Sequence, residues 1–343
     1  YGISIPRPFC VSGPIFKERE VSRVLRYIAK RLAYIFLAVL VISAITFALL
    51  QLAPGNYLET QRLLEKTMTD ATVSAQMKEA WEKFYDLDKP AVYRYGKFLV
   101  NAVQGKFGPS YKYPTQNIED IIGRTLPISA RLALMAITVA LAVGIPLGIV
   151  AAVKQNRILD RIVMLVSMIG SSVPAYVTAV LLSWALGVAL HLLPVIGWGD
   201  AVNYVLPVIS LSLGPVGTVT KYTRTTLVET FHQEYIRVAR AKGGNFFQVT
   251  FKHALRNSLI PLVTVIGPMV ASLTVGTVFV ENMFAIPGLG QYYASAAINR
   301  DYPMVMATTV VFALLVMGMN LLVDILHAML DPRVKKSLTQ KGG

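Results

Sequence analysis

Six long apolar segments limit what this chain can fold into. To within a few residues they cover 32–53, 127–153, 162–190, 205–222, 258–280 and 304–330. A helix of about 20 residues crosses the hydrocarbon layer of a bilayer, which is about 30 Å thick. Only 15% of the residues are charged, whereas about a quarter are charged in soluble domains. The sequence therefore predicts an all-α polytopic membrane protein with six transmembrane helices.

The basic residues are distributed as in a membrane protein and not as in a nucleic-acid-binding protein. The chain has 33 Lys and Arg residues and a net charge of +14. Lys and Arg are enriched in cytoplasmic loops. Here they cluster in the leader 1–31, in 154–161, in 221–257 and in the tail 331–343. We expect both termini on the cytoplasmic side of the membrane, with lipid as a partner and no nucleic acid.

The first loop, residues 54–126, is predicted to be helical and to lie outside the cell. It has ten basic and nine acidic residues, and long loops are translocated largely regardless of their charge. Two amphipathic stretches, 67–87 and 89–105, show apolar residues at helical spacing. The first stripe consists of Val73, Met77, Trp81, Phe84 and Tyr85, and the second of Tyr95, Phe98, Leu99 and Val103.

The remaining segment, 127–330, is predicted to form a five-helix core. Pro174, which follows two serines, predicts a kink or break in the third span. In the second span Ala140, Gly144, Gly148 and Ala152 recur every four residues. Gly267 and Ala271, then Ser272 and Gly276, repeat the pattern in the fifth span. Small residues one turn apart let membrane helices approach closely. Packing is the simpler interpretation, and a lining for a substrate path is the alternative.

The sequence shows no catalytic constellation, and we expect no enzyme activity from this chain. It contains no GxxxxGK[ST] phosphate loop, no HExxH and no GxSxG. Cys10 is the only cysteine, so no intramolecular disulfide or cysteine metal cluster is expected. Asp324 and His327 lie one turn apart in the last span. They indicate either a proton or metal path or, more simply, a pair that satisfies itself near the cytoplasmic end. No catalytic, cofactor or metal site is predicted.

The loop at about 225–257 interrupts the apolar chain with a charged helix-turn-helix pattern. Residues 234–242 suit a short helix, which Gly243 and Gly244 can end in the left-handed conformation. Asn245 can then cap a second helix. In that helix Phe247, Phe251 and Ala254 form an apolar stripe. The pair of helices is suited either to the lipid surface or to a groove on a soluble partner.

The sequence of this loop resembles that of bacterial ABC-importer permeases. RVARAKG at 237–243 and HALRNSLIP at 253–261 match the branch of the family that includes peptide and nickel permeases. The resemblance extends over nearly the whole chain beyond the leader. It includes LAPGN, YDLDKPAVYRYGKFL, QGKFGPSY, VENMFAIPGLGQ and LLVDILHAMLDPRV. The chain looks most like the first of the two permease subunits of an oligopeptide or dipeptide importer.

The resemblance implies a type I ABC-importer permease fold and a set of partners. These are a second permease subunit, two ABC ATPase subunits that carry ATP and Mg, an extracytoplasmic solute-binding protein and a peptide substrate. The loop would couple the ATPase to the spans, which alternate their access to the two sides. The coupling-loop residues implied are Glu234, Tyr235, Arg237, Ala239, Arg240, Ala241, Lys242, Gly243, Phe246, Phe247, Phe251, His253 and Arg256.

Other functions fit the sequence less well. Nickel permeases share this loop sequence. A path for a metal ion favours His, Cys or Asp within the spans, however, and this chain has few of them there. Some relatives carry oligosaccharides, and the sequence leaves that possibility open. An intramembrane protease needs a Ser/His or paired-Asp constellation within the spans. A receptor needs a signalling domain, for which no cytoplasmic segment is long enough.

Overall fold

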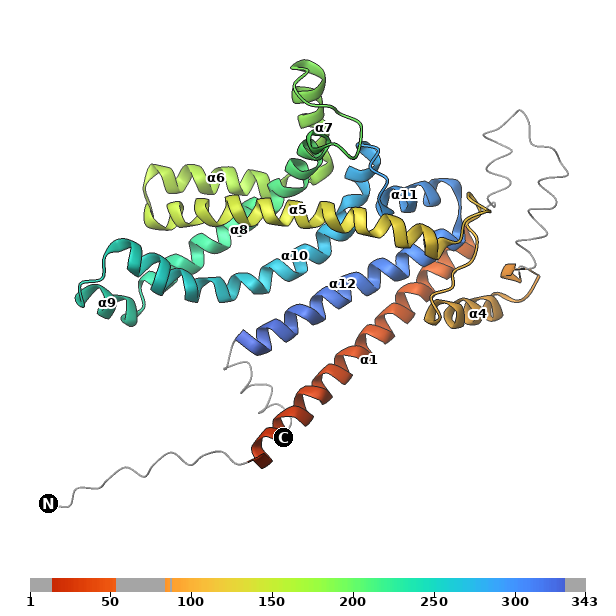
Figure 1. Cartoon of the computed structure of the whole chain (residues 1–343), viewed down its shortest axis with the longest axis horizontal. Coiled ribbons are helices and arrows are strands. Elements are labelled where there is room, and N and C mark those ends of the chain that lie inside the picture. Colours follow the sequence, from red (N-terminus) through yellow and green to blue (C-terminus); the bar gives the residue numbers. More distant parts are fainter. Residues whose placement is uncertain (1–13, 54–83, 87, 331–343) are drawn as a thin grey trace.

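The computed structural model describes residues 14–53, 84–86 and 88–330, and it is helical without a β-strand throughout these ranges (Figure 1). The elements are α1 (Pro14–Leu52), α4 (Ala91–Val103), α5 (Ile118–Val153), α6 (Ile158–Ser172), α7 (Ala175–Leu182), the π-helix η1 (Ser183–Ala189), the 3₁₀-helix η2 (Ala201–Tyr204), α8 (Val205–Phe231), α9 (Glu234–Ala241), the π-helix η3 (Gln248–Leu255), α10 (Arg256–Met283), α11 (Leu289–Asn299) and α12 (Tyr302–Leu330). The start of the leader, most of the amphipathic stretch 67–87 and the tail 331–343 lie outside the described residues.

The described residues contain four helical segments that are long and apolar enough to cross a membrane. They are Ile28–Leu52, Ile118–Val153, Ala201–Phe231 and Tyr302–Ile325, and the bent pair α6 and α7–η1 adds a fifth candidate. The predicted span 258–280 lies on α10, a 28-residue helix outside this group. The all-α membrane architecture is confirmed, and the count of six spans remains a prediction.

The third predicted span is broken, as Pro174 indicated. Helix α6 ends at Ser172, and α7 begins at Ala175 after a bend of 102°. Proline disfavours the helical conformation of the residue before it, and Val173 is extended here, with ψ of 124°. The predicted kink or break within the apolar segment 162–190 is therefore confirmed, and it lies at the predicted place.

Helices α5 and α8 pack side by side along most of their length (Figure 1). Ala140, Gly144, Gly148 and Ala152 are all buried on α5. A Cβ atom at Gly148 would lie 2.6 Å from Cβ of Thr223 and 2.8 Å from the carbonyl oxygen of Thr220 on α8. The small residues therefore bring the two backbones together, and packing is the correct interpretation of this stripe.

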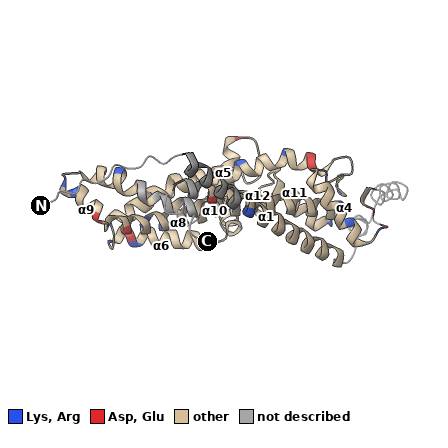
Figure 2. Ribbon diagram, turned by 90° about the horizontal axis from the view of Figure 1, so that it is seen from below, with Lys and Arg blue, Asp and Glu red and all other residues tan. Residues whose placement is uncertain are grey.

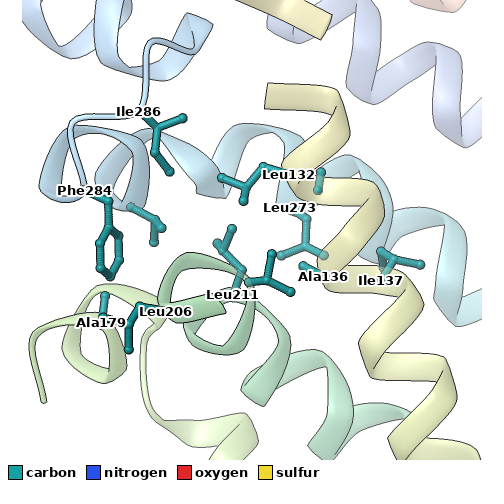
Figure 3. Packing of buried hydrophobic residues seen from close by; sticks show 12 residues of the cluster. Leu132, Ala136, Ile137, Ala179, Leu206, Leu211, Leu273, Phe284 and Ile286 are labelled. Atoms are coloured by element: carbon teal, nitrogen blue, oxygen red, sulfur yellow. The ribbon is translucent and has the colours of Figure 1, made fainter. Parts of the chain in front are cut away.

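The main apolar core lies where α5, α7, α8 and the end of α10 meet (Figure 3). Leu132 and Ala136 of α5 lie near Leu211 of α8 and Leu273 of α10, and Leu206 of α8 lies beside Ala179 of α7. Phe284 and Ile286, just after α10, are 1% and 0% exposed and belong to this cluster. This core joins α5, α7, α8 and α10.

The second predicted helix of the 54–126 loop is present as α4, which lies against α1 (Figure 1). The Tyr95 hydroxyl donates to the carbonyl oxygen of Leu40 at 3.0 Å and lies 2.9 Å from Oγ of Ser43. Tyr95, Phe98 and Leu99 are half-buried, as the stripe predicted. Val103, at the end of the same apolar stripe, is 85% exposed. It lies at the end of α4, beyond the contact with α1.

Residues 106–117, which link α4 to α5, are fixed to the bundle by two carboxylates. Glu119 Oε2 accepts hydrogen bonds from the backbone N–H groups of Phe107 and Gly108 at 3.0 and 3.2 Å. Asp301, just before α12, accepts from the Ser110 hydroxyl and from the Lys112 N–H at 3.1 Å. The segment is therefore an ordered part of the molecule.

Candidate functional site

The charged loop folds as α9, a tight turn and the π-helix η3. Gly243 has φ of +83°, the left-handed conformation predicted for it. Its N–H donates to the Arg240 carbonyl at 3.0 Å, and the Gly244 N–H donates to the Ala239 carbonyl at 3.1 Å. This pair of bonds is a Schellman motif, which satisfies the last carbonyls of a helix. The predicted end of the first helix is confirmed.

Asn245 begins the next helical segment, as predicted. Its Oδ1 accepts from the Gln248 N–H at 2.8 Å, and its own N–H donates to Oε1 of Gln248 at 3.3 Å. These reciprocal bonds form a capping box. The turn between Lys242 and Asn245 is therefore fixed at both ends by backbone hydrogen bonds.

The second segment differs from the prediction in its helical type. Residues Gln248–Leu255 form a π-helix that continues directly into α10. Hydrogen bonds in a π-helix join residues five apart, and Val249 and Ala254 accordingly share the buried face. Phe247 and Phe251 lie outside, with exposed fractions of 69% and 50%. The predicted stripe of Phe247, Phe251 and Ala254 was therefore wrong, because it assumed α-helical spacing.

A small apolar cluster anchors the loop to the bundle. Ile236 of α9 is fully buried and packs with Leu227 of α8, Val249 and Ala254 of η3, and Ala152 of α5. Ile236 was not among the predicted site residues. The spacing of Ile236 and Ala239, two apolar residues three positions apart on one helical face, was the signal that could have identified it.

The outer face of the loop is aromatic and basic. The Phe247 and Phe251 rings are stacked with centroids 6.2 Å apart, and Phe246 meets Phe247 edge-on at 5.8 Å. Tyr235, Val238 and Phe246 are 41%, 52% and 53% exposed. The remaining exposed side chains of this face are Glu234, Arg237, Arg240, Ala241, Lys242, Lys252 and His253. Ala239 is half-buried, and Arg256 is the first residue of α10, with its side chain outside the described part.

This outer face has the composition of a protein-binding surface. Exposed aromatic residues surrounded by polar groups are typical of interfaces. The four basic side chains, Arg237, Arg240, Lys242 and Lys252, outnumber the one acid, Glu234. Figure 2 shows charged residues near α9 and near α4, at opposite ends of the molecule. Charge complementarity favours an acidic partner with an apolar groove at the α9 end.

A buried ion pair connects the helices that carry the site. Arg224 of α8 donates from Nε and Nη2 to the two carboxylate oxygens of Asp160 on α6, at 3.2 and 2.8 Å. Asp160 also accepts from the Asn156 N–H at 2.9 Å. Bidentate pairs of this kind fix geometry as well as adding energy. The pair therefore joins α6 to α8, the helix that leads into α9.

A second buried carboxylate lies at the other end of α10. Glu281 is fully buried, and its Oε2 accepts from the Gln291 N–H at 3.2 Å. The Leu289 N–H donates to Oγ of Ser129 at 2.9 Å, and Gly288 and Gly290 leave room for the carboxylate. Glu281 therefore holds the turn between α10 and α11. Within the described ranges, no group of three or more His, Cys, Asp or Glu residues is placed to hold a metal ion.

Comparison with known proteins gives a consistent family assignment. Residues 144–336 match the family described as "Binding-protein-dependent transport system inner membrane component". The dipeptide transport system permease protein of Bacillus subtilis is 38% identical over 92% of this chain and 99% of its own length. The oligopeptide transport system permease protein of Escherichia coli is 32% identical over 91% of this chain and all of its own. An inward-facing structure of the MetNI methionine ABC transporter matches the fold at 19% identity, with a TM-score of 0.51, over 64% of this chain and 97% of that one.

Proposed function

This chain belongs to the family of binding-protein-dependent transport system inner membrane components, and we propose that it is the permease subunit of an ATP-driven importer for dipeptides or oligopeptides. The relatives named above are peptide permeases that match almost the whole chain. The chain forms half of the translocation path, and a second, homologous permease subunit forms the other half.

The observation that carries the proposal is the exposed aromatic and basic face of α9 and η3. Phe246, Phe247 and Phe251 are at least half exposed, although each is large and apolar. Burial of one such side chain contributes about 1.5–3 kcal/mol, which favours a partner that covers them. We assign this face to the groove of an ABC ATPase subunit, one of two that bind ATP and Mg beneath the permease pair.

The mechanism follows from how the face is attached. When the ATPase subunits close on ATP, α9 moves with them, because its Schellman turn and the buried Ile236 leave it little independent freedom. The motion passes through the Arg224–Asp160 pair and the α5–α8 contact to the spans. The bundle then exposes its path alternately to each side. This chain supplies the moving spans and half of the path for the peptide. ATP is hydrolysed on the partner ATPase subunits.

The orientation of the chain in the membrane follows from the assignment of the α9 and η3 face to the ATPase. The α9 end, the leader and the tail lie in the cytoplasm, and α4 with the 106–117 segment lies outside, where a solute-binding protein delivers the peptide. Six spans, with α10 as the fifth, bring both termini to the cytoplasmic side.

A matched pair of phenylalanines tests the docking face. Phe247 and Phe279 are both 69% exposed, but Phe279 is near the opposite end of α10. We expect at least tenfold less ATPase to copurify with the Phe247→Ala variant than with the unchanged chain when each is co-expressed with the partner ATPase subunits. Central aromatic residues of an interface contribute about 2 kcal/mol or more. Phe279→Ala is expected to retain the wild-type amount. Equal retention by both variants would move the docking site elsewhere.

The substrate class is tested separately by uptake into cells or proteoliposomes that contain the whole complex. Labelled di- and oligopeptides are expected to be imported, and excess unlabelled peptide to compete. Import of nickel or of an oligosaccharide without peptide import would reject the peptide assignment and leave the permease assignment intact.

A further inference from the structure

A cavity of about 190 Å³ lies between α1 and α12. These two helices run next to each other (Figure 1). The residues that line it include Arg31, Tyr34 and Ile35 from α1 and Asn320, Leu321 and Asp324 from α12. This volume is well above the roughly 10–15 Å³ that a single water needs. The cavity is polar at the end formed by Arg31 and Asp324 and is otherwise lined largely by apolar side chains.

The polar end of the cavity holds a positively charged and a negatively charged side chain. Nη2 of Arg31 lies 3.0 Å from Oδ2 of Asp324, and the two side chains are 43% and 26% exposed. Nζ of Lys30 lies 5.8 Å from the centre of the Tyr34 ring, which brings a second cation near the cavity. Sequence analysis had paired Asp324 with His327 as its simpler interpretation. The structure pairs Asp324 with Arg31. The His327 side chain lies outside the described part, so the pairing with His327 stays a prediction.

Each of the two charges lies near one end of a candidate span. Arg31 comes three residues after the start of the apolar segment Ile28–Leu52, and Asp324 comes one residue before the end of Tyr302–Ile325. Phospholipid headgroups occupy this level of a bilayer. Only 6% of the apolar window of α1 is buried, against 33% for that of α12. The α1 side of the cavity is therefore open on the surface of this chain.

We propose that this cavity binds the headgroup of a zwitterionic phospholipid with a primary ammonium, of the phosphatidylethanolamine type. The phosphate is bound by Arg31, whose planar fork of N–H donors matches phosphate oxygens, with Lys30 as a second cation. The ammonium donates hydrogen bonds to Asp324 and to the side-chain oxygen of Asn320. The first carbons of the acyl chains lie against Tyr34, Ile35 and Leu321.

The carboxylate of Asp324 makes the cavity selective among phospholipid headgroups. An anionic lipid such as phosphatidylglycerol gains from Arg31 and Lys30, but Asp324 repels it. Phosphatidylcholine has the same net charge as phosphatidylethanolamine, but its quaternary ammonium has no N–H to donate to Asp324 or Asn320. The cavity therefore selects by hydrogen bonding as well as by charge. A bound lipid would brace α1 against α12 on the side that carries the docking face.

The test measures lipid retained by the full-length chain within its complex in nanodiscs that contain equal parts of phosphatidylethanolamine, phosphatidylglycerol and phosphatidylcholine. The unchanged chain is expected to enrich phosphatidylethanolamine several-fold over the bulk. Arg31→Gln is expected to abolish the enrichment. Asp324→Asn is expected to shift it toward phosphatidylglycerol, because the repulsion is removed. No enrichment by the unchanged chain, or enrichment of phosphatidylcholine to the same degree, overturns the proposal.

The control is the ion pair of Lys97 and Asp86, which is 2.6 Å long and has similar exposure, 35% and 23%, near α4. Lys97→Gln and Asp86→Asn are expected to leave the lipid composition unchanged. The alternative occupant is a helix of a partner subunit. Disulfide cross-linking of a Leu321→Cys variant to another permease subunit, with no lipid enrichment, would assign the cavity to protein contact and reject the lipid.

Discussion

The Ser110 hydroxyl donates a hydrogen bond to the carboxylate of Asp301, which lies 191 residues later in the chain. Asp301 is 1% exposed and also accepts from the backbone N–H groups of Lys112 and Met304, at 3.1 and 3.3 Å. It therefore caps the start of α12 and holds the 106–117 segment at the same time. One buried carboxyl group joins the outer loop to the last span.

This contact should depend on pH. Burial raises the pKa of Asp301 above its ordinary value of 3.8, although hydrogen bonds from Ser110 and Lys112 oppose the change. The folded protein then binds the proton more tightly than the unfolded chain does. The resulting stability is fully present below pH 3.8 and is lost as the pH rises through the raised pKa.

Thermal unfolding of the purified complex at a series of pH values tests this. The unfolding midpoint of the unchanged chain is expected to fall, relative to that of Asp301→Asn, as the pH rises above 3.8, because the amide does not titrate. Asp88→Asn, at a carboxylate that is 65% exposed, serves as the control and should follow the unchanged chain. Parallel curves for the unchanged chain and Asp301→Asn would show that Asp301 does not control this stability.

Gly243→Val should weaken coupling through the backbone alone. An added Cβ atom meets nothing within 4 Å among the described residues, but the φ of +83° remains. A left-handed conformation costs an L-residue about 1–2 kcal/mol, which corresponds to a factor of about 5–30 in an equilibrium. We expect transport and transport-coupled ATP hydrolysis to fall together, while insertion into the membrane is retained. Gly243→Asn is the matched control, because asparagine tolerates this conformation, and it should retain most activity. If Gly243→Val is present at normal abundance and transports normally, the turn at Gly243 is not needed to couple ATP hydrolysis to transport.

Ile236→Ala should loosen α9 from the bundle. Ile236 is 0% exposed, and truncation of a buried isoleucine to alanine typically costs about 2–5 kcal/mol. We expect faster proteolysis within 232–247 and reduced retention of the ATPase. Val238→Ala is the control on the same helix, since Val238 is 52% exposed, and it should leave the proteolysis rate unchanged. Equal proteolysis of the two variants would show that the cluster around Ile236 does not hold α9.

Two glycines of α5 should respond in opposite directions to alanine. A Cβ atom at Gly148 would overlap Thr223 and the Thr220 carbonyl, whereas one at Gly123 meets no atom within 4 Å in the described structure. Overpacking costs about 1–3 kcal/mol, so Gly148→Ala should lower the unfolding midpoint and reduce transport. Gly123→Ala should raise stability by about 0.5–1 kcal/mol, because alanine favours the helix. A neutral Gly148→Ala would show that α5 and α8 can separate without loss.

Several elements could be predicted because their causes are local. The apolar segments on α1, α5, α8 and α12 are long enough to cross a bilayer, and the chain could be assigned to a membrane from them alone. The turn at Gly243 and the cap at Asn245 depend on the conformations open to neighbouring residues. The break at Pro174 has the same local origin. Each of these features is confirmed where the structure describes it.

Other features depend on residues that are distant in the sequence. Phe247 and Ala254 were expected on one face, but the π-helix at Gln248–Leu255 places them on opposite sides, because packing of Ala254 in the Ile236 cluster sets the helical register. The partners of Asp301 and Asp324 likewise come from Ser110 and Arg31, which no spacing pattern connects to them. The sequence by itself determined the helices, the membrane and the turn of the docking loop, because these follow from hydrophobicity and backbone conformation. Only the tertiary structure decided which side chains of this loop are exposed and which carboxylates join distant segments, because burial and pairing depend on how the helices pack.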